Sequence, residues 1–262
     1  MKIVNVAKLN EEAEYLRLCC YGEPGTGKTW FGASACLSEA TSPVLYLEYR
    51  AQIASIRNNP KYVQAIENGR LRILSLDDYG DLNRVYTWLF AGPGNVEVFD
   101  KLFDGQLPKT VVLDSITEIQ RAEVMRRAGN IPGKFVRDVE QPQIQHWGSL
   151  LNQFTLLAHL FFQLPMHVVF LGLEAVDYGS RTVGETPRIV GRQIALQGQA
   201  QRQFPAYALT LMRLEKAPIG SNAYSIGLTQ GVMSATKEQT GRFPAKIGNP
   251  TIPGMAKLLE GE

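Results

Sequence analysis

Cysteine is scarce in this chain of 262 residues, and its positions exclude two common uses of the residue. The chain has three cysteines, at Cys19, Cys20 and Cys36. Adjacent residues of a strand point to opposite faces, so Cys19 and Cys20 cannot serve the same bridge or the same metal. The pattern predicts neither a disulfide framework nor a zinc site, and we expect buried thiols.

Excess charge and long apolar runs are also missing. Lys and Arg number 27 against 25 Asp and Glu, which gives a formal net charge of +2. This balance indicates no polyanion partner by itself, so a nucleic-acid surface would need local clustering of basic residues. No apolar run is long enough to span a bilayer, and the N-terminal residues lack the apolar segment of a signal peptide. We expect no membrane contact and a reducing, cytoplasmic location.

What the chain does have is enough apolar material for a large core. Hydrophobic residues make up 45% of the sequence and charged residues 20%, which is typical of a globular protein. The length allows one large α/β domain or two small ones. We find no internal repeat, and we expect a single domain over residues 1–262, with a lead-in at 1–14 and a C-terminal tail at 245–262.

The sequence GEPGTGKT at residues 22–29 matches the pattern G-x-x-x-x-G-K-[ST] of the phosphate-binding P-loop, or Walker A motif. Glycines let the backbone curl so that successive N–H groups face an anion, and the following helix adds its positive N-terminal end. Lys28 would reach the β- and γ-phosphates, and Thr29 would place its hydroxyl on Mg²⁺. The predicted nucleotide-binding residues are Gly22, Glu23, Pro24, Gly25, Thr26, Gly27, Lys28, Thr29 and Trp30.

The segments around this loop fit the assignment. Residues 15–21 (YLRLCCY) are typical of a buried strand, and residues 30–40 of a helix. A second apolar run, at residues 43–47, leads into Glu48 and Arg50, at the carboxyl end of a strand where α/β folds place ligands. The chain then continues with an expected helix at 61–68, strand at 70–76 and helix at 79–91. Such alternation predicts βαβ units and a parallel sheet.

Residues 110–114 (TVVLD) form a second informative stretch. An apolar run that ends in an acid has the Walker B form, whose carboxylate holds Mg²⁺ through water. Its place about 85 residues after the P-loop, followed by SITE, strengthens the assignment. We therefore predict that Asp114 joins Thr29 at the metal. The alternative is an Asp that only caps the next helix.

Two later segments lack periodicity and carry basic side chains. Residues 129–141 hold Lys134, Phe135 and Arg137. Residues 177–203 form a longer polar stretch, and long loops inside compact domains are usually functional. The arginines of this second stretch are Arg181, Arg188, Arg192 and Arg202.

Regular elements are expected around these segments. A long helix is predicted over residues 142–163, and a buried strand over 168–172. Glu174 follows this strand, at a position that can sense the γ-phosphate in a P-loop ATPase. Residues 207–215 and 224–228 are typical of antiparallel strands.

Together, the Walker A loop, the strand ending in Glu48, the phrase LDSITE, the long helix and the strand VVFLGLE resemble the core of RecA-type ATPases. A late turn with Lys and Arg completes the pattern. The chain resembles in particular the bacteriophage nucleotide-binding ATPases that include RecA-like single-strand annealing proteins of phage recombination. The resemblance covers most of the chain, roughly residues 15–253.

This resemblance implies a single RecA-like P-loop core, with a mostly parallel central sheet, helices on both faces and antiparallel strands at the C-terminal side. It implies ATP and Mg²⁺, DNA-stimulated ATP hydrolysis, single-stranded DNA and a single-strand-binding protein as partners, and a location in the host cytoplasm. It also implies head-to-tail self-association into a ring or filament with nucleotide between subunits.

The resemblance further places two DNA loops, at residues 129–141 and 178–203. Arginines there suit phosphate contacts, and aromatic rings such as Tyr178 can stack on bases. The implied DNA-binding residues are Lys134, Phe135, Arg137, Arg181, Arg188 and Arg192. The alternative is that these charges form a solvated face or contact a neighbouring subunit.

The position of the catalytic glutamate departs from the RecA pattern. RecA-type recombinases carry it two residues after the acid that ends the strand following Walker A, and Arg50 stands there in this chain. We predict Glu118 as the residue that polarises the attacking water, together with the catalytic Lys28. Glu48 is the alternative, and a simple helix N-terminal role for Glu118 is another.

A second departure concerns the late turn. Related ATPases often show a Lys-acid-Arg triplet there, whereas this chain reads Lys237-Glu238-Gln239. Lys237 or Arg242 is the candidate for a charge-stabilising finger that reaches across a subunit interface.

The sequence thus predicts an ATP-binding and ATP-hydrolysing protein that binds single-stranded DNA in phage recombination, annealing or replication. Two alternatives stay open. A P-loop phosphotransferase acting on a small molecule shares the loop, but a lid of clustered arginines is not evident. An ATP-binding assembly or packaging component with little turnover would be compatible with Arg50 in the glutamate position.

Overall fold

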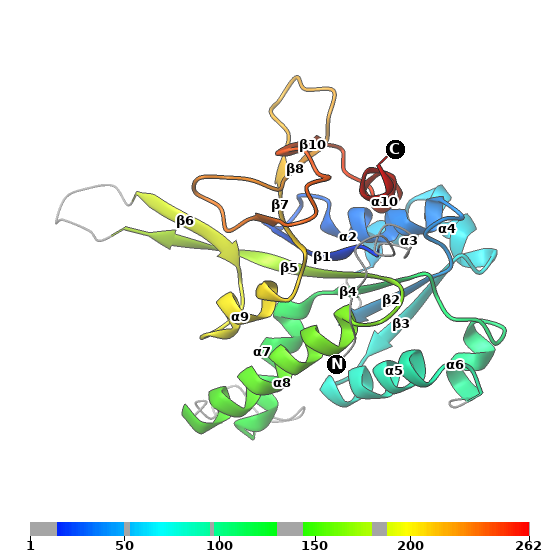
Figure 1. Ribbon diagram of the computed structural model, residues 1–262. Coiled ribbons are helices and arrows are strands. Elements are labelled where there is room, and N and C mark those ends of the chain that lie inside the picture. Colours follow the sequence, from blue (N-terminus) through cyan, green and yellow to red (C-terminus); the bar gives the residue numbers. More distant parts are fainter. Residues whose placement is uncertain (1–14, 50–52, 95–96, 130–143, 180–187, 262) are drawn as a thin grey trace, which may run out of the picture.

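A mixed sheet forms the centre of the molecule (Figure 1). The structure is a computed structural model that describes residues 15–49, 53–94, 97–129, 144–179 and 188–261. The strands are β1 (Arg17–Gly22), β2 (Val44–Tyr49), β3 (Leu71–Leu76), β4 (Thr110–Asp114), β5 (His167–Tyr178), β6 (Ile189–Ile194), β7 (Thr210–Lys216), β8 (Ser225–Leu228), β9 (Lys237–Glu238) and β10 (Lys246–Gly248).

Helices follow most of these strands in the chain. They are α2 (Lys28–Ala33), the 3-10 helix η1 (Ser34–Leu37), α3 (Ala54–Arg57), α4 (Pro60–Glu67), α5 (Tyr79–Ala91), α6 (Glu97–Leu102), α7 (Ile116–Arg127), α8 (Ile144–Phe162), α9 (Ala200–Ala206) and α10 (Ile252–Glu260). Within the described ranges, no helix is long and apolar enough to cross a bilayer.

The strand order is β10-β8-β7-β1-β5-β4-β2-β3, with β6 paired to β5 and β9 paired to β7. The strands from β7 to β3 in this order run parallel to one another. The strand β8 is antiparallel to β7, and β10 is antiparallel to β8. The predicted fold class, an α/β core with a mostly parallel sheet and antiparallel strands at the C-terminal side, is confirmed.

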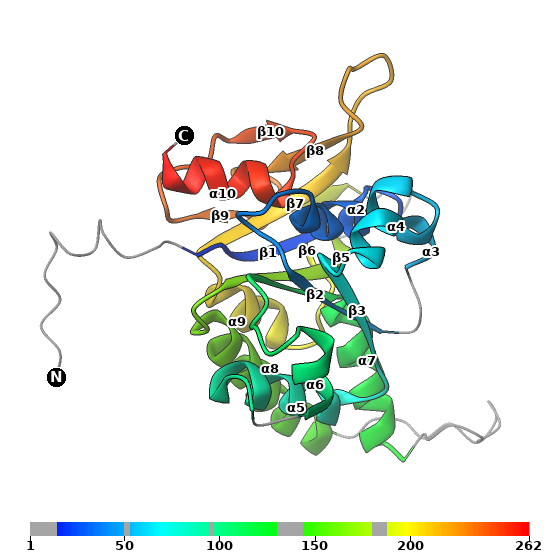
Figure 2. The same cartoon turned by 90° about the vertical axis from the view of Figure 1, so that its right-hand side faces the viewer.

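Helices cover both faces of the sheet, as Figure 2 shows. One apolar cluster joins Leu18 and Cys20 of β1 to α2, α4 and α10. The other joins Cys19 and Tyr21 to α5, α7 and α8. The two adjacent cysteines therefore do lie on opposite faces, and all three thiols are buried and free. Burial raises the pKa of Cys20 to about 12, so its thiol stays protonated.

The parallel register brings several chain ends to one edge of the sheet. Gly22 pairs with Leu173, and Asp114 pairs with both Leu171 and Glu48. The carboxyl ends of β1, β2 and β4 and the middle of β5 are consequently neighbours, although they are far apart in the sequence. This edge is where open α/β sheets hold ligands.

The stretch at residues 177–203 differs from the predicted long loop. The strand β5 runs well past residue 172 and pairs antiparallel with β6, and the short helix α9 follows. Figure 1 shows this two-stranded ribbon projecting beyond the rest of the sheet. We call residues 174–178 and 189–194 the arm. Because both faces of the arm are partly exposed, its sequence lacks the apolar alternation that marks a strand.

Two smaller differences concern helices. The helix expected at residues 30–40 is a single short helix, α2, continued by the 3-10 turn η1. No helix is predicted from the sequence between residues 92 and 105, where the structure has the short helix α6.

Candidate nucleotide site

The loop between β1 and α2 has the curled backbone that its sequence predicts. Gly25 and Gly27 have φ angles of 75° and 93°, a left-handed conformation that residues with a side chain rarely adopt. A Cβ atom on Gly22 would lie 2.2 Å from the carbonyl oxygen of Leu214 on β7. Thr26 closes the turn, since its hydroxyl donates to the carbonyl of Glu23 at 2.9 Å. The three glycines are thus required by backbone geometry and by close packing.

Lys28 lies over the start of this loop. Its Nζ donates to the carbonyl oxygens of Gly22 at 2.8 Å and Glu23 at 2.7 Å. The side chain is largely buried, and burial lowers the pKa of its amine. Its positive charge is therefore held inside the loop, next to the backbone that would receive a phosphate.

The two predicted metal residues are in direct contact. The hydroxyl of Thr29 donates to Oδ2 of Asp114 at 2.8 Å, although 85 residues separate them in the chain. Tyr46 donates to the same oxygen at 2.6 Å. Burial raises the pKa of Asp114, while the hydrogen bonds from Tyr46 and Thr29 oppose this shift.

The alternative interpretation of Asp114, as a helix cap, is wrong. The N-cap of α7 is Ser115, whose side-chain oxygen accepts a hydrogen bond from the N–H of Glu118 at 3.3 Å. Asp114 is thereby left to face Thr29.

The donor set at Thr29 and Asp114 fits Mg²⁺. Magnesium prefers oxygen ligands and keeps several waters, and at phosphate sites it takes one or two carboxylates plus phosphate oxygens. A hydroxyl and a carboxylate side by side meet this need. A cage of three or more His, Cys, Asp or Glu side chains does not occur in the described part of the chain, and this type of site does not require one.

The two glutamates that are candidates for polarising the attacking water lie on different faces of the sheet. Glu48 is buried on the strand next to β4, in register with Asp114. It lies two residues after Tyr46, so both side chains face the side of the sheet that α2 covers. Glu118 belongs to α7 on the opposite face, pairs with Arg121 at 2.8 Å, and lines a separate cavity beside α5. Glu118 is the residue that the sequence predicts to polarise the attacking water, and Glu48 is the alternative. The geometry favours Glu48 for this role.

A cavity of about 330 Å³ lies against the P-loop. Trp30 is at its margin, where its ring stacks on Tyr224 with centroids 5.9 Å apart. Tyr224 also donates to the carbonyl of Gly25 at 3.2 Å. The cavity is lined by Pro24, Gly25, Gly27, Lys28, Thr29, Trp30, Ser55, Asp114, Ser115, Leu173 and Tyr224.

Two tyrosines of this site, Tyr46 and Tyr224, are not among the residues predicted from the sequence. Tyr46 could have been found, because strand alternation places it on the same face as Glu48. No local signal identifies Tyr224, since it comes from the β7–β8 connection and reaches the loop only through the tertiary fold.

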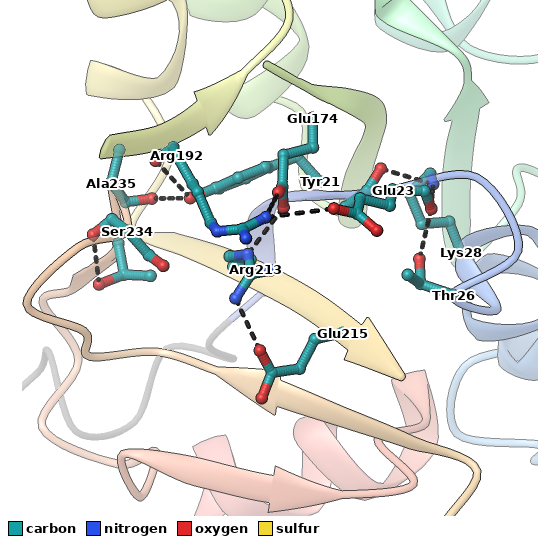
Figure 3. A network of polar contacts seen from close by, with 12 residues as sticks. Tyr21, Glu23, Thr26, Lys28, Glu174, Arg192, Arg213, Glu215, Ser234 and Ala235 are labelled. Carbon is teal, nitrogen blue, oxygen red and sulfur yellow. Dashed lines mark hydrogen bonds and ion pairs between the residues drawn. The ribbon is translucent and has the colours of Figure 1, made fainter. Parts of the chain in front are cut away.

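Arg192, a predicted DNA-binding residue, lies beside the P-loop instead of on an open loop. Its Nη1 donates to the carboxylates of Glu174 and Glu23, as Figure 3 shows. Glu174 also accepts from Arg213. The interpretation of Arg192 as a free phosphate contact for DNA is therefore not supported by its surroundings.

The other predicted DNA-binding residues divide into two groups. Arg188 is exposed and directly precedes the second strand of the arm. The remaining ones lie outside the described residues, as does Arg50. They are Lys134, Phe135, Arg137 and Arg181.

Lys237, a candidate interface finger, is hydrogen-bonded within its own chain. Its Nζ donates to the carbonyl oxygens of Ala206 at 2.8 Å and Ala208 at 2.7 Å, at the end of α9. The strand β9 pairs with the amino end of β7, away from the edge that carries the P-loop. Arg242 is exposed and stays a candidate.

A P-loop between β1 and α2, an acid at the end of β4 and one strand between β1 and β4 together define the class of this protein. It is an α/β protein with a mostly parallel sheet and a P-loop at the carboxyl end of β1.

The chain is similar to several solved structures. It matches the flagellar accessory protein FlaH of Methanocaldococcus jannaschii with a TM-score of 0.46 and 13% identity over 92% of this chain and 89% of that one. It matches a KaiC-like protein of Pyrococcus horikoshii with a TM-score of 0.40 and 15% identity over 80% of this chain and 77% of that one.

A third similar structure is an ATPase from the type III secretion system of pathogenic bacteria, with a TM-score of 0.40 and 13% identity. The match covers 92% of this chain but 60% of that one. Comparison with protein-family models and with curated proteins finds no match. The resemblance to phage recombination ATPases therefore stays a prediction.

Proposed function

We propose that this protein binds ATP with Mg²⁺ and hydrolyses it. The observation that carries the proposal is the hydrogen bond between Thr29 and Asp114, which joins the Walker A and Walker B residues at the mouth of the P-loop cavity. Lys28 would leave the carbonyl groups of the loop and pair with the phosphates. Mg²⁺, held by Thr29 and Asp114, would neutralise charge on the phosphate oxygens.

The proposal assigns the attacking water to Glu48. This carboxylate lies next to Asp114 on the sheet, so a water oriented by it would also be close to the metal. Catalysis of phosphoryl transfer depends mainly on such positioning and on charge stabilisation. Tyr224 and Trp30, at the margin of the cavity, are suited to contact the base of the nucleotide through their ring faces.

We further propose that the arm binds single-stranded DNA, and that the protein acts in recombination, annealing or replication. Tyr178 is 60% exposed. Arg188 lies beside it, because the neighbouring Gly179 donates from its N–H to the carbonyl of Arg188 at 2.9 Å. The exposed ring and the exposed arginine supply the two kinds of group that stack on bases and contact phosphates.

ATP binding and turnover by wild-type protein and Lys28→Ala test the first proposal. We expect the variant to lose ATP affinity by at least about a hundredfold, since the lysine contacts the phosphates of bound nucleotide directly. Removal of Mg²⁺ should stop turnover. Binding without turnover would contradict the hydrolysis proposal and favour an assembly component.

A salt series with a fluorescent single strand tests the second proposal. Three phosphate contacts would lower the affinity about twentyfold between 50 and 200 mM salt, because each contributes a slope of about −0.7. Arg188→Glu should flatten this slope, whereas Arg84→Glu, a charge reversal at an exposed arginine of α5, should not. No binding at low salt would contradict a DNA partner.

A further inference from the structure

A buried carboxylate with two arginines lies beside the P-loop (Figure 3). The side chain of Glu174, on β5, has 0% exposure. Arg192 of β6 donates to its Oε1, and Arg213 of β7 donates to its Oε2 at 2.7 Å. A buried charge is stable only when it is paired in this way. These two ion pairs are therefore fixed parts of the fold.

Each arginine also has a second, more exposed acidic partner. Arg192 reaches Glu23 of the P-loop at 3.2 Å, and the side chain of Glu23 is 59% exposed. Arg213 reaches Glu215 at 2.6 Å. An exposed ion pair is screened by water and contributes little to stability. Arg192 thus has one permanent partner, Glu174, and one partner that another anion could replace.

The terminal phosphate of bound ATP would arrive next to this exchangeable pair. Lys28, which pairs with the β- and γ-phosphates in a P-loop, lies 2.7 Å from the carbonyl oxygen of Glu23. The peptide of Glu23 is therefore adjacent to the phosphate position, and its side chain already holds Arg192. The buried Glu174 keeps the guanidinium at this place.

We propose that Arg192 is a residue of the ATP site itself, which exchanges Glu23 for the terminal phosphate. Glu174 and Arg213 are positioning residues that keep the guanidinium beside the loop. Arg192 donates hydrogen bonds to the phosphate and takes no part in making or breaking bonds. This inference rests on the ATP-binding function proposed above, and it places a charge-stabilising arginine in the same chain.

The backbone around Arg192 supports such a side-chain exchange. Its carbonyl oxygen accepts from the hydroxyl of Tyr21 at 3.1 Å and from the N–H of Ala235 at 2.7 Å. The main chain is thus anchored to β1 and to the segment before β9, and only the end of the side chain needs to move. Because Arg192 belongs to the arm, the exchange would make the arm respond to the terminal phosphate.

Binding of ADP and of a nonhydrolysable ATP analogue, each with Mg²⁺, tests the proposal. Arg192→Gln should weaken binding of the analogue at least about tenfold, the effect of losing a charge-assisted hydrogen bond. ADP affinity should stay within about twofold, because ADP lacks the terminal phosphate. The matched control is Gln193→Ala, since Gln193 points to the other face of β6 and pairs with Asp177.

Equal losses for both nucleotides in Arg192→Gln would show a purely structural role and overturn the proposal, as would no loss for either. If Arg192→Gln does not fold, Glu23→Gln is the variant that tests the proposal, because a change at an exposed side chain leaves the fold intact. Release of Arg192 from Glu23 should raise the preference for the analogue over ADP about threefold, and an unchanged preference overturns the proposal. Wild-type protein that binds neither nucleotide would overturn the ATP-binding function as well.

Discussion

Lys237 shows how a single charged residue acquires its role from the fold. Its amine donates to two carbonyl groups at the end of α9, and burial lowers its pKa. The last carbonyls of a helix lack partners within the helix, so a lysine at this position satisfies them. The structure therefore gives Lys237 a stabilising role inside its own chain.

We expect Lys237→Gln to lower the free energy of unfolding by about 1–2 kcal/mol, because carbonyls at the end of α9 lose their donor. Urea unfolding measures this change. ATP turnover per folded molecule should stay within about twofold of wild type. Lys246→Gln, at an exposed lysine of β10, is the control and should leave stability unchanged. A large fall in turnover with unchanged unfolding would instead indicate an interface finger.

At the scale of elements, a buried histidine joins the amino ends of β5 and β1. Nδ1 of His167 accepts a hydrogen bond from the N–H of Leu16 at 3.0 Å, and its ring meets Tyr15 edge to face. Burial, with a smaller contribution from the charge of Lys109, lowers the pKa of His167 to about 4. The imidazole is therefore neutral in the folded protein at pH 7.

The lowered pKa of His167 makes the free energy of unfolding depend on pH between about 6.5 and 4. Unfolded His167 has a pKa of about 6.5, so the unfolded chain takes up the proton first as the pH falls. The stability present above pH 6.5 is lost progressively towards pH 4, by about 2–3 kcal/mol at pH 4.5. Urea unfolding at several pH values measures it. His167→Asn keeps an acceptor for Leu16 but cannot titrate, so the stability of this variant should fall less than that of wild type as the pH is lowered. Identical pH profiles for the variant and wild type would contradict the assignment to His167.

The arm shows where prediction from sequence stops for elements. The strand β4 could be predicted residue by residue, because buried on both faces it forms an unbroken apolar run that ends in Asp114. The arm has polar residues on both faces and glycine at position 191, so local composition favours a loop. Only pairing of β6 with β5 reveals it as a ribbon.

At the scale of the whole molecule, the sheet separates two apolar clusters and meets the nucleotide site at one edge. The residues of that edge come from the P-loop, α2, β2, β4, β5 and the β7–β8 connection. A ligand that binds this edge contacts strands across the fold, so its binding energy opposes global unfolding.

We therefore expect MgATP at a hundred times its dissociation constant to stabilise the protein by about 2.7 kcal/mol. For a chain of this size, this corresponds to a rise in melting temperature of about 5–10 °C. Thermal unfolding with and without nucleotide measures the shift. Lys28→Ala should show no rise at the same nucleotide concentration. A rise that persists in this variant would place the stabilising site elsewhere.

The sequence by itself determined the P-loop, the acid at Asp114 and the parallel α/β core, because each depends on a local pattern of glycine, charge or apolar spacing. The tertiary structure alone decided that Thr29 contacts Asp114, that Tyr224 covers the loop and that Arg192 is held by Glu174. The physical reason is distance along the chain. These contacts join segments that only the register of the sheet brings together, and the same residue types in an open loop would have had different partners.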